Sequence, residues 1–173
     1  MNCPKCNGYR LKPKKLENGL LAFACDNCQG SLLPMLQYLQ WAEQHSTTII
    51  DACIEFKLDE TSQALLCPKC SGLMTKYRIS AQSENRLDIC NRCYETWLDS
   101  GEWQLLKHLQ VLDKLPKIFT EAWQKNIQTE IAEENQQNRD KEHFENDFEQ
   151  IKTFKTWLDK YHKKQDVLIY LNK

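Results

Sequence analysis

Eight cysteines of this chain stand in four Cys-x2-Cys pairs, and thiols at this spacing can bind a metal ion. The pairs run as C-x2-C-x18-C-x2-C and then as C-x2-C-x19-C-x2-C, spacings typical of structural zinc sites. In such a pair the backbone curls so that both sulfurs point inward, and a glycine just beyond is expected to supply a positive φ. The sequence therefore predicts two zinc ions per chain, bound by Cys3, Cys6, Cys25 and Cys28 and by Cys67, Cys70, Cys90 and Cys93.

Other uses of paired thiols fit the sequence less well. Disulfides require an oxidising compartment, and the first six residues contain no export signal. Thioredoxin-like chemistry requires a pair at a helix N-terminus, whereas these pairs are expected on hairpins. Rubredoxin-like iron uses the same four-cysteine set, so iron remains a less favoured alternative to zinc. Short loops favour ligand sets within one module, although an interleaved pairing stays open.

The remaining metal-ligating residue types are predicted to pack or to face solvent. Cys53 lies in an apolar run, where a lone cysteine is usually a small core residue. Four cysteines saturate each site, so no open position for catalysis is expected. The histidines are predicted to be surface or packing residues, and they are His45, His108, His143 and His162.

The two cysteine sets belong to a duplicated module. Cys3-Pro4-Lys5-Cys6 is repeated as Cys67-Pro68-Lys69-Cys70, and aligning the later pairs places Leu32 on Trp97. A module of this size falls below the roughly 40 residues at which an apolar core alone usually suffices, while structural zinc contributes about 10–16 kcal/mol. We therefore expect each module to depend on its metal for folding.

A β-hairpin is predicted between the cysteine pairs of each module. In the first module Leu11–Leu16 and Leu20–Ala24 flank Glu17-Asn18-Gly19, and Asn-Gly is a strong hairpin signal. In the second module Leu73–Ile79 and Arg86–Ile89 flank a polar loop over residues 80–85.

A helix is predicted after each hairpin. The second one is expected over residues 100–113, with Asp99 and Glu102 forming a capping box. The apolar spacing that indicates the two helices comes from Leu32, Leu33, Leu36, Leu39 and Ala42, and from Trp103, Leu106, Leu109 and Leu112.

The last third of the chain is predicted to be helical. Pro116 suits a first helical turn, and residues 133–142 are either an exposed part of one long helix or the connection of a hairpin. The type of the apolar run 166–171 stays undecided. The two apolar stripes consist of Phe119, Trp123, Ile127 and Ile131, and of Phe144, Phe148, Ile151, Phe154, Leu158 and Tyr161.

These elements predict a small metal-bound α+β fold. It contains two four-cysteine zinc ribbons, each a β-hairpin plus a helix, followed by a long helical C-terminal segment. The expected segments are a first ribbon over 1–46, a linker element of undecided type over 47–66, a second ribbon over 67–113 and a helical tail over 114–173.

Charge and hydropathy restrict the environment of the protein. The formal net charge is −1, and each tetrathiolate zinc site adds about two negative charges, so the chain offers no general attraction to phosphate or to a bilayer. No run approaches the roughly 18 apolar residues of a membrane span. We expect a soluble, cytoplasmic protein.

The second module resembles a known family. The run from Leu87 to Trp103, preceded by Cys67-Pro68-Lys69-Cys70, is similar to the small bacterial zinc ribbons related to that of transcription factor IIB. The specific part is Trp97-Leu98-Asp99-x-Gly101-Glu102. The resemblance covers about the middle quarter of the chain. It implies zinc on the cysteines of the second module and, because the ribbon of transcription factor IIB engages the polymerase as a protein, a transcription-linked partner.

The favoured function is a non-enzymatic zinc-binding adaptor or regulator that acts through protein–protein interaction. The helical tail is expected to fold back on the chain, to dock a protein partner or to self-associate. Trp97 and Trp103 are predicted to close a small core, with a partner surface as the alternative. A nucleic-acid-binding regulator and a thiol-redox sensor that releases zinc are the competing functions. The nucleic-acid interface would use Lys5, Arg10, Lys12, Lys14 and Lys15.

Overall fold

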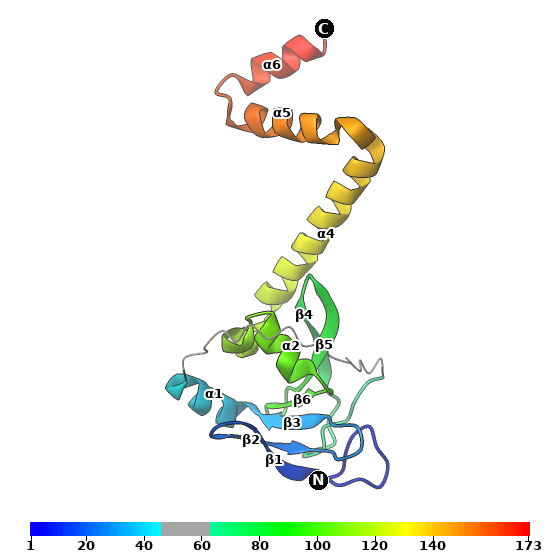
Figure 1. Ribbon diagram of the computed structural model, residues 1–173, viewed down its shortest axis with the longest axis vertical. Coiled ribbons are helices and arrows are strands. Elements are labelled where there is room, and N and C mark those ends of the chain that lie inside the picture. Colours follow the sequence, from blue (N-terminus) through cyan, green and yellow to red (C-terminus); the bar gives the residue numbers. More distant parts are fainter. Residues whose placement is uncertain (46–62) are drawn as a thin grey trace. The chain divides into compact units, whose positions relative to one another are not determined.

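The computed structural model describes residues 1–45 and 63–173, so Cys53 and most of the predicted linker element lie outside the described residues. The chain forms two compact units, Met1–Gln128 and Thr129–Lys173 (Figure 1). The predicted fold class is confirmed, because two four-cysteine ribbons are followed by long helices. The division into four segments stays a prediction.

The first ribbon consists of strands β1 (Lys12–Glu17) and β2 (Leu20–Ala24), a third strand β3 (Ser31–Pro34) and helix α1 (Met35–Gln44). The predicted hairpin is confirmed, and Gly19 turns the chain with a φ of 82°. The predicted helical stripe was wrong. Leu32 and Leu33 belong to β3, and the buried face of α1 consists of Met35, Tyr38 and Trp41, while Leu36 is 70% exposed.

The second ribbon repeats this order with β4 (Thr75–Ser80), β5 (Ser83–Cys90), β6 (Glu95–Leu98) and α2 (Glu102–His108). The predicted six-residue loop is in fact a tight turn, because Ser80 already pairs with Ser83. The predicted helix over 100–113 is also shorter in the structure. Gln110 adopts a φ of 55°, so α2 stops and a short 3₁₀ helix, η1 (Leu112–Lys114), follows.

The two ribbons share one antiparallel sheet of six strands in the order β1-β2-β3-β6-β5-β4. The central pair is β3 with β6, in which Leu32 lies opposite Trp97. These two residues are equivalent in the sequence repeat. An antiparallel pair that sets a residue opposite its own equivalent relates the two ribbons by a local two-fold axis, as in a symmetric dimer.

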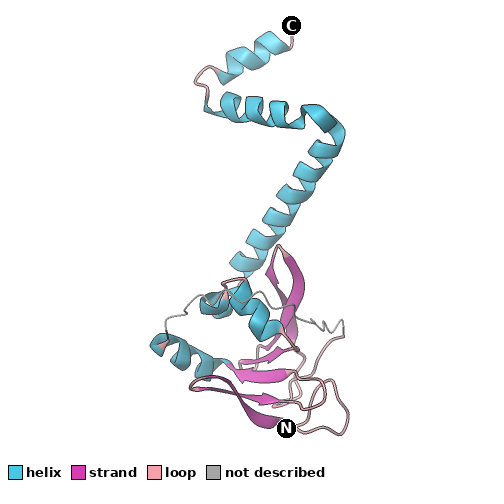
Figure 2. Ribbon diagram, in the orientation of Figure 1, coloured by secondary structure: helices cyan, strands magenta, loops and turns pink. Residues whose placement is uncertain are grey.

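Each face of the sheet carries its own apolar cluster, as the alternation of side chains along a strand requires. Leu33 and Leu98 face the larger cluster, which α1, α2, η1 and helix α3 (Leu115–Ile118) cover (Figure 2). Leu32 and Trp97 face the other cluster, which contains cysteines of both metal sites. The sheet therefore holds the two cysteine sites on the face opposite to the helices.

The edge strand β4 receives the first turn of helix α4 (Glu121–Phe144). Trp123 donates its indole N–H to the Ile79 carbonyl at 3.1 Å. The Gln124 side chain accepts the Arg78 N–H at 3.1 Å and donates to the Arg78 carbonyl at 2.8 Å. This amide takes the place of a neighbouring strand.

The second unit is helical. α4 continues through residues 133–142, so this polar stretch is an exposed part of a long helix, and α4 ends before Glu145, whose φ is 43°. The short 3₁₀ helix η2 (Glu145–Asp147) leads into α5 (Phe148–Lys160), and α6 (Lys164–Leu171) ends the chain. None of the helices in residues 1–45 and 63–173 is long and apolar enough to cross a membrane.

Candidate metal centres

The first metal site lies where two turns of the first ribbon meet. The sulfurs of Cys3, Cys6, Cys25 and Cys28 all lie within 4.8 Å of one another. The Cys6 N–H donates to the Cys3 sulfur at 3.3 Å. The Asn27 side-chain amide donates to the Cys6 sulfur at 3.2 Å. Hydrogen bonds of this kind stabilise negative sulfur and fix its direction.

The second site repeats the arrangement with Cys67, Cys70, Cys90 and Cys93, again within 4.8 Å of one another. The Cys67 and Cys93 sulfurs are 3.4 Å apart, and those of Cys70 and Cys93 are 3.7 Å apart. A tetrahedral ion with Zn–S distances of about 2.3 Å sets its sulfurs about 3.8 Å apart. Both sets therefore approach the size of a zinc tetrathiolate, and local pairing within each ribbon is confirmed over the interleaved alternative.

Left-handed backbone at the cysteine turns is provided mostly by residues other than glycine. Gln29, Ser71 and Tyr94 directly follow the second cysteine of their pairs, and each has a φ between 56° and 59°. The expectation that glycine supplies the positive φ holds for Gly8, at 81°. It was wrong for Gly30 and Gly72, neither of which has a positive φ. Gly30 instead leaves room for a ring, because a Cβ at Gly30 would lie 2.3 Å from the Trp97 Cζ2 atom.

The thiols of each site cannot all ionise easily without a cation. Burial raises the pKa of Cys28, and the neighbouring Cys3 raises it further. Burial also raises the pKa of Cys90, but hydrogen bonds from the Cys93 and Arg92 N–H groups outweigh it and lower that pKa to about 7. A divalent ion that accepts four thiolates removes this conflict. The donor set fits zinc, so the two sites are compatible with two zinc ions per chain.

The arrangement supports a structural metal. Four thiolates complete a tetrahedron and leave no position for a water or a substrate. In the described part of the chain, neither ligand group includes a histidine. His45 instead stacks on Trp41, with ring centroids 4.9 Å apart.

Trp97 and Trp103 are core residues, as the favoured prediction had it. Trp97 is 0% exposed and Trp103 is 5% exposed. The alternative of a partner surface at these tryptophans was wrong, because burial within the two clusters leaves neither ring accessible.

The Trp97-Leu98-Asp99-x-Gly101-Glu102 run joins the second ribbon to the first. Trp97 donates its indole N–H to the Asp99 carboxylate at 2.7 Å, and Lys5 of the first ribbon binds the same carboxylate at 3.0 Å. The Asp99 N–H donates to the Glu102 carboxylate at 2.8 Å, which is one half of the predicted capping box. The other half was wrong, because no side chain of the described residues caps the N-terminus of α2. Gly101 directly precedes α2 as its N-cap and has a φ of 87°, so this position needs glycine.

Several contacts between the ribbons carried no signal in the sequence. Glu17 of the β1–β2 hairpin accepts the Trp103 indole N–H at 3.0 Å and binds Lys107. Tyr38 of α1 donates to the Leu112 carbonyl. Residues that meet across a local two-fold axis are far apart in the chain, so neither periodicity nor spacing indicates them.

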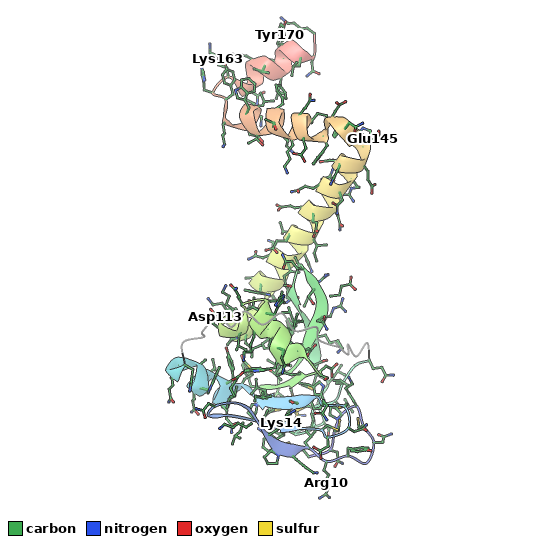
Figure 3. All side chains as sticks on the ribbon, viewed as in Figure 1. Arg10, Lys14, Asp113, Glu145, Lys163 and Tyr170 are labelled. Carbon is green, nitrogen blue, oxygen red and sulfur yellow. The ribbon has the colours of Figure 1, made fainter. Side chains whose placement is uncertain are left out.

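Three of the lysines predicted for a partner or nucleic-acid surface, Lys12, Lys14 and Lys15, lie on β1 at the edge of the sheet, whereas Lys5 binds Asp99. Lys12 pairs with Asp26 at 2.6 Å, while Lys14 (Figure 3) and Lys15 are exposed. Lysine and proline on an edge strand also prevent pairing with another sheet, and this strand contains both.

Comparison with known proteins places the resemblance on the first ribbon. Residues 2–44 match the family model described as transcription factor zinc-finger, the zinc ribbon of transcription factor IIB type. The resemblance was expected instead on the second ribbon, over the run from Leu87 to Trp103. No curated protein and no solved structure matches the chain. The family resemblance is thus confirmed for residues 2–44, about a quarter of the chain, which are similar to zinc ribbons of the transcription factor IIB type.

Proposed function

We propose that this protein is a non-enzymatic zinc-binding adaptor or regulator. The two zinc-bound ribbons form a fixed body, and the helical tail binds protein. The closed four-thiolate geometry of both sites supports a structural metal rather than a catalytic one. We place its activity in the cytoplasm, where thiols stay reduced and available to zinc.

The apolar face of the tail carries this proposal. Within residues 129–173, which the structure describes completely, Leu158 is the one buried apolar side chain. Ile151, Phe154 and Trp157 are 37%, 44% and 48% exposed. Contiguous exposed apolar side chains mark interaction sites, and amphipathic aromatic rings are frequent anchors in protein interfaces.

A transcription-linked partner is the finer part of the proposal. It is supported by the match of residues 2–44 to a family described as transcription factor zinc-finger. The argument is one of family likeness, because related ribbons can bind different partners.

The test is a photo-cross-link from the tail in the cells of origin. A photo-reactive residue at Trp157 is expected to form a covalent adduct with a protein, either a second copy or another chain. The matched control carries the same residue at Leu36, which is 70% exposed but lies on α1. Absence of an adduct at Trp157, or equal adducts at both positions, contradicts tail-mediated binding.

The nucleic-acid alternative has weaker support. Lys14 and Lys15 are exposed, but protection of the β1 edge explains them equally well. Electrostatic binding weakens steeply as salt rises. A binding assay with single-stranded DNA tests this alternative. No binding at low salt, or an affinity that does not fall as the salt concentration rises, would eliminate it.

The thiol-redox alternative depends on access to the sulfurs. Cys25 and Cys90 are buried, while Cys6 and Cys70 are partly exposed. Mild peroxide should then release zinc if the protein is a sensor. Full retention of zinc with all thiols reduced would remove this function.

A further inference from the structure

The two metal sites share their ligands and turns but differ in one hydrogen bond. In the first site Asn27 donates its side-chain amide to the Cys6 sulfur at 3.2 Å. Arg92 holds the place of Asn27 in the second site, between the two cysteines of the later pair. Among residues 1–45 and 63–173, no side chain outside the ligand set donates to the sulfur of Cys70, the equivalent of Cys6. The second site therefore lacks a donor that the first site has.

Exposure does not distinguish the two sites. Each ligand set has two buried and two partly exposed cysteines, and these alternate in the same order along the chain. Cys6 and Cys70 are both partly exposed. A small reagent therefore reaches the equivalent sulfurs of both sites, and their relative reactivity depends on the electronic state of each sulfur.

The amide of Asn27 lowers the reactivity of the sulfur that it contacts. A thiolate reacts as a nucleophile through its free electron pairs. A donated hydrogen bond withdraws electron density from the sulfur and stabilises its anionic, metal-bound form. Cys6 is protected in this way, whereas Cys70 retains its full nucleophilicity.

Nearby positive charges do not reverse this difference. Lys5 and Lys69 stand at the same position of their cysteine pairs, and each binds a buried carboxylate, Asp99 at 3.0 Å and Glu95 respectively. The two lysines therefore affect their sites in a similar way. The Arg92 side chain is exposed, so solvent screens its charge, and a direct hydrogen bond to sulfur has the larger effect.

We propose that Cys70 is the first residue of this protein that a peroxide oxidises, so that the second metal site opens before the first. The Cys70 thiolate attacks one oxygen of hydrogen peroxide, an S–O bond forms, the O–O bond breaks, and the leaving hydroxide takes a proton from water. A second thiolate of the site then attacks the sulfenic acid, so that an S–S bond forms and hydroxide leaves again. Two thiolates thereby lose two electrons in total, and the peroxide is reduced to two water molecules.

Loss of two ligands releases the zinc ion of that site, because the metal is bound by thiolates and not by a disulfide. The inference goes beyond the proposed function, since it concerns the metal sites and does not depend on what the tail binds.

The test is oxidation of the full-length zinc-bound protein. Hydrogen peroxide is raised until one of the two zinc ions has been released, the remaining thiols are alkylated, and mass spectrometry locates the oxidised cysteines. A dione that traps sulfenic acid should label Cys70. The second site should react roughly tenfold faster than the first, as is common when an outer-shell hydrogen bond is absent. The disulfide is expected within Cys67, Cys70, Cys90 and Cys93, while the first set stays reduced.

Four variants separate the amide from other causes. Asn27→Ala should raise the oxidation rate of the first site to that of the second. Arg92→Asn supplies the missing amide and should slow the second site about tenfold. Arg92→Ala removes the guanidinium alone and should react like the native protein. Asn91→Ala is the matched control, because Asn91 donates to the Thr75 hydroxyl at 3.3 Å and not to a sulfur.

Zinc content and far-UV circular dichroism before oxidation should match the native protein in every variant. Earlier oxidation of the first site, equal rates at the two sites, or a dione adduct on another cysteine would overturn the proposal. So would an unchanged first site in Asn27→Ala or an unchanged second site in Arg92→Asn. A changed rate in Arg92→Ala would assign the difference to charge or cover and would also overturn it. The cross-link at Trp157 is a separate measurement, so the proposed function can fail or stand independently.

Discussion

At the scale of single residues, Trp97 of the second ribbon packs directly over Gly30 of the first. The indole is fully buried on the sheet face that carries the cysteines, and it fills the space above Gly30. In the sequence repeat, Trp97 corresponds to Leu32 and Gly30 corresponds to Glu95. The large Trp97 side chain of the second ribbon thus needs a glycine beside it in the first ribbon. Leu32, the equivalent residue of the first ribbon, is smaller and needs no glycine beside it in the second.

Replacing Gly30 by alanine is expected to destabilise residues 1–128. The added Cβ would lie 2.3 Å from Trp97 Cζ2, so the ring or the strand must move, at a cost of about 1–3 kcal/mol. Chemical denaturation of the zinc-bound protein measures this loss. Gly72→Ala is the control, since its Cβ would make ordinary 3.4 Å contacts and should cost less.

The double variant G30A/W97F tests the cause of that loss. Phenylalanine lacks the part of the indole that the new Cβ meets, so the two changes should be non-additive in the free energy of unfolding. Strict additivity would show that Gly30→Ala acts through the backbone rather than through Trp97.

Glu102 provides a pH-dependent contribution to stability. Burial raises its pKa well above the ordinary value of 4.5, although the N–H of Asp99 opposes this shift. A carboxyl group whose pKa is higher in the folded state than in the unfolded state makes its full contribution to stability at pH values below the unfolded-state pKa. That contribution is lost as the pH rises through the folded pKa.

Glu102→Gln should therefore become more stable relative to the native protein as the pH rises above 4.5. Glutamine retains an acceptor for the Asp99 N–H but cannot ionise. The difference in free energy of unfolding should grow by at most about 1.4 kcal/mol per pH unit. Denaturation across the pH range in which zinc stays bound measures it, with the exposed Glu84→Gln as control. A difference that does not change with pH contradicts the assignment.

At the scale of elements, Gln124 protects the edge of the sheet at β4. Its amide forms both hydrogen bonds that a seventh strand would offer to Arg78, and it also donates to the Ile118 carbonyl at 2.9 Å. The opposite edge, β1, is protected by lysines and Pro13 instead. The two edges are thus closed by different means, although the ribbons are repeats.

Gln124→Ala should expose this edge and destabilise residues 1–128 by about 1–2 kcal/mol, the usual result of removing partners from buried polar groups. Gln124→Glu should destabilise more, because a carboxylate would face two carbonyl oxygens. Hydrogen exchange of the Arg78 amide should become faster in Gln124→Ala, which removes the oxygen that accepts its N–H. The exposed Gln128→Ala on the same helix is the control, and equal exchange in all proteins contradicts the capping role.

Local signals predicted the parts of this fold that depend on neighbouring residues. Asn18-Gly19 predicted the first hairpin, the cysteine spacing predicted both ligand sets, and Asp99 with Glu102 predicted the start of α2. Strands β3 and β6 could not be predicted, because four-residue strands are too short to show a period. Each of these strands forms by pairing with the other, and the paired residues Leu32 and Trp97 are 65 positions apart in the sequence. The buried face of α1 was likewise set by the second ribbon, which Tyr38 and Trp41 contact.

At the scale of the whole molecule, the sheet of residues 1–128 behaves as a dimer of ribbons within one chain. Each ribbon contributes three strands and one four-cysteine site, and the β3–β6 pair joins them. Lys5–Asp99 and Glu17–Lys107 cross the same interface. Each metal therefore stabilises a surface on which the other ribbon packs, so the two sites should be energetically coupled.

Removing one site should accordingly weaken the other. Cys3→Ser disables the first site, which loosens β1–β3 and removes the pairing partner of β6. Zinc at the second site should then yield to a competing chelator at a concentration roughly tenfold lower than in the native protein, a coupling of about 1.4 kcal/mol. Cys67→Ser should weaken the first site by a similar factor, because coupling between two sites is reciprocal. Elemental analysis should give two zinc ions per native chain before the titration. If the remaining site of each variant instead resists the chelator as strongly as it does in the native protein, the ribbons fold independently in spite of their common sheet.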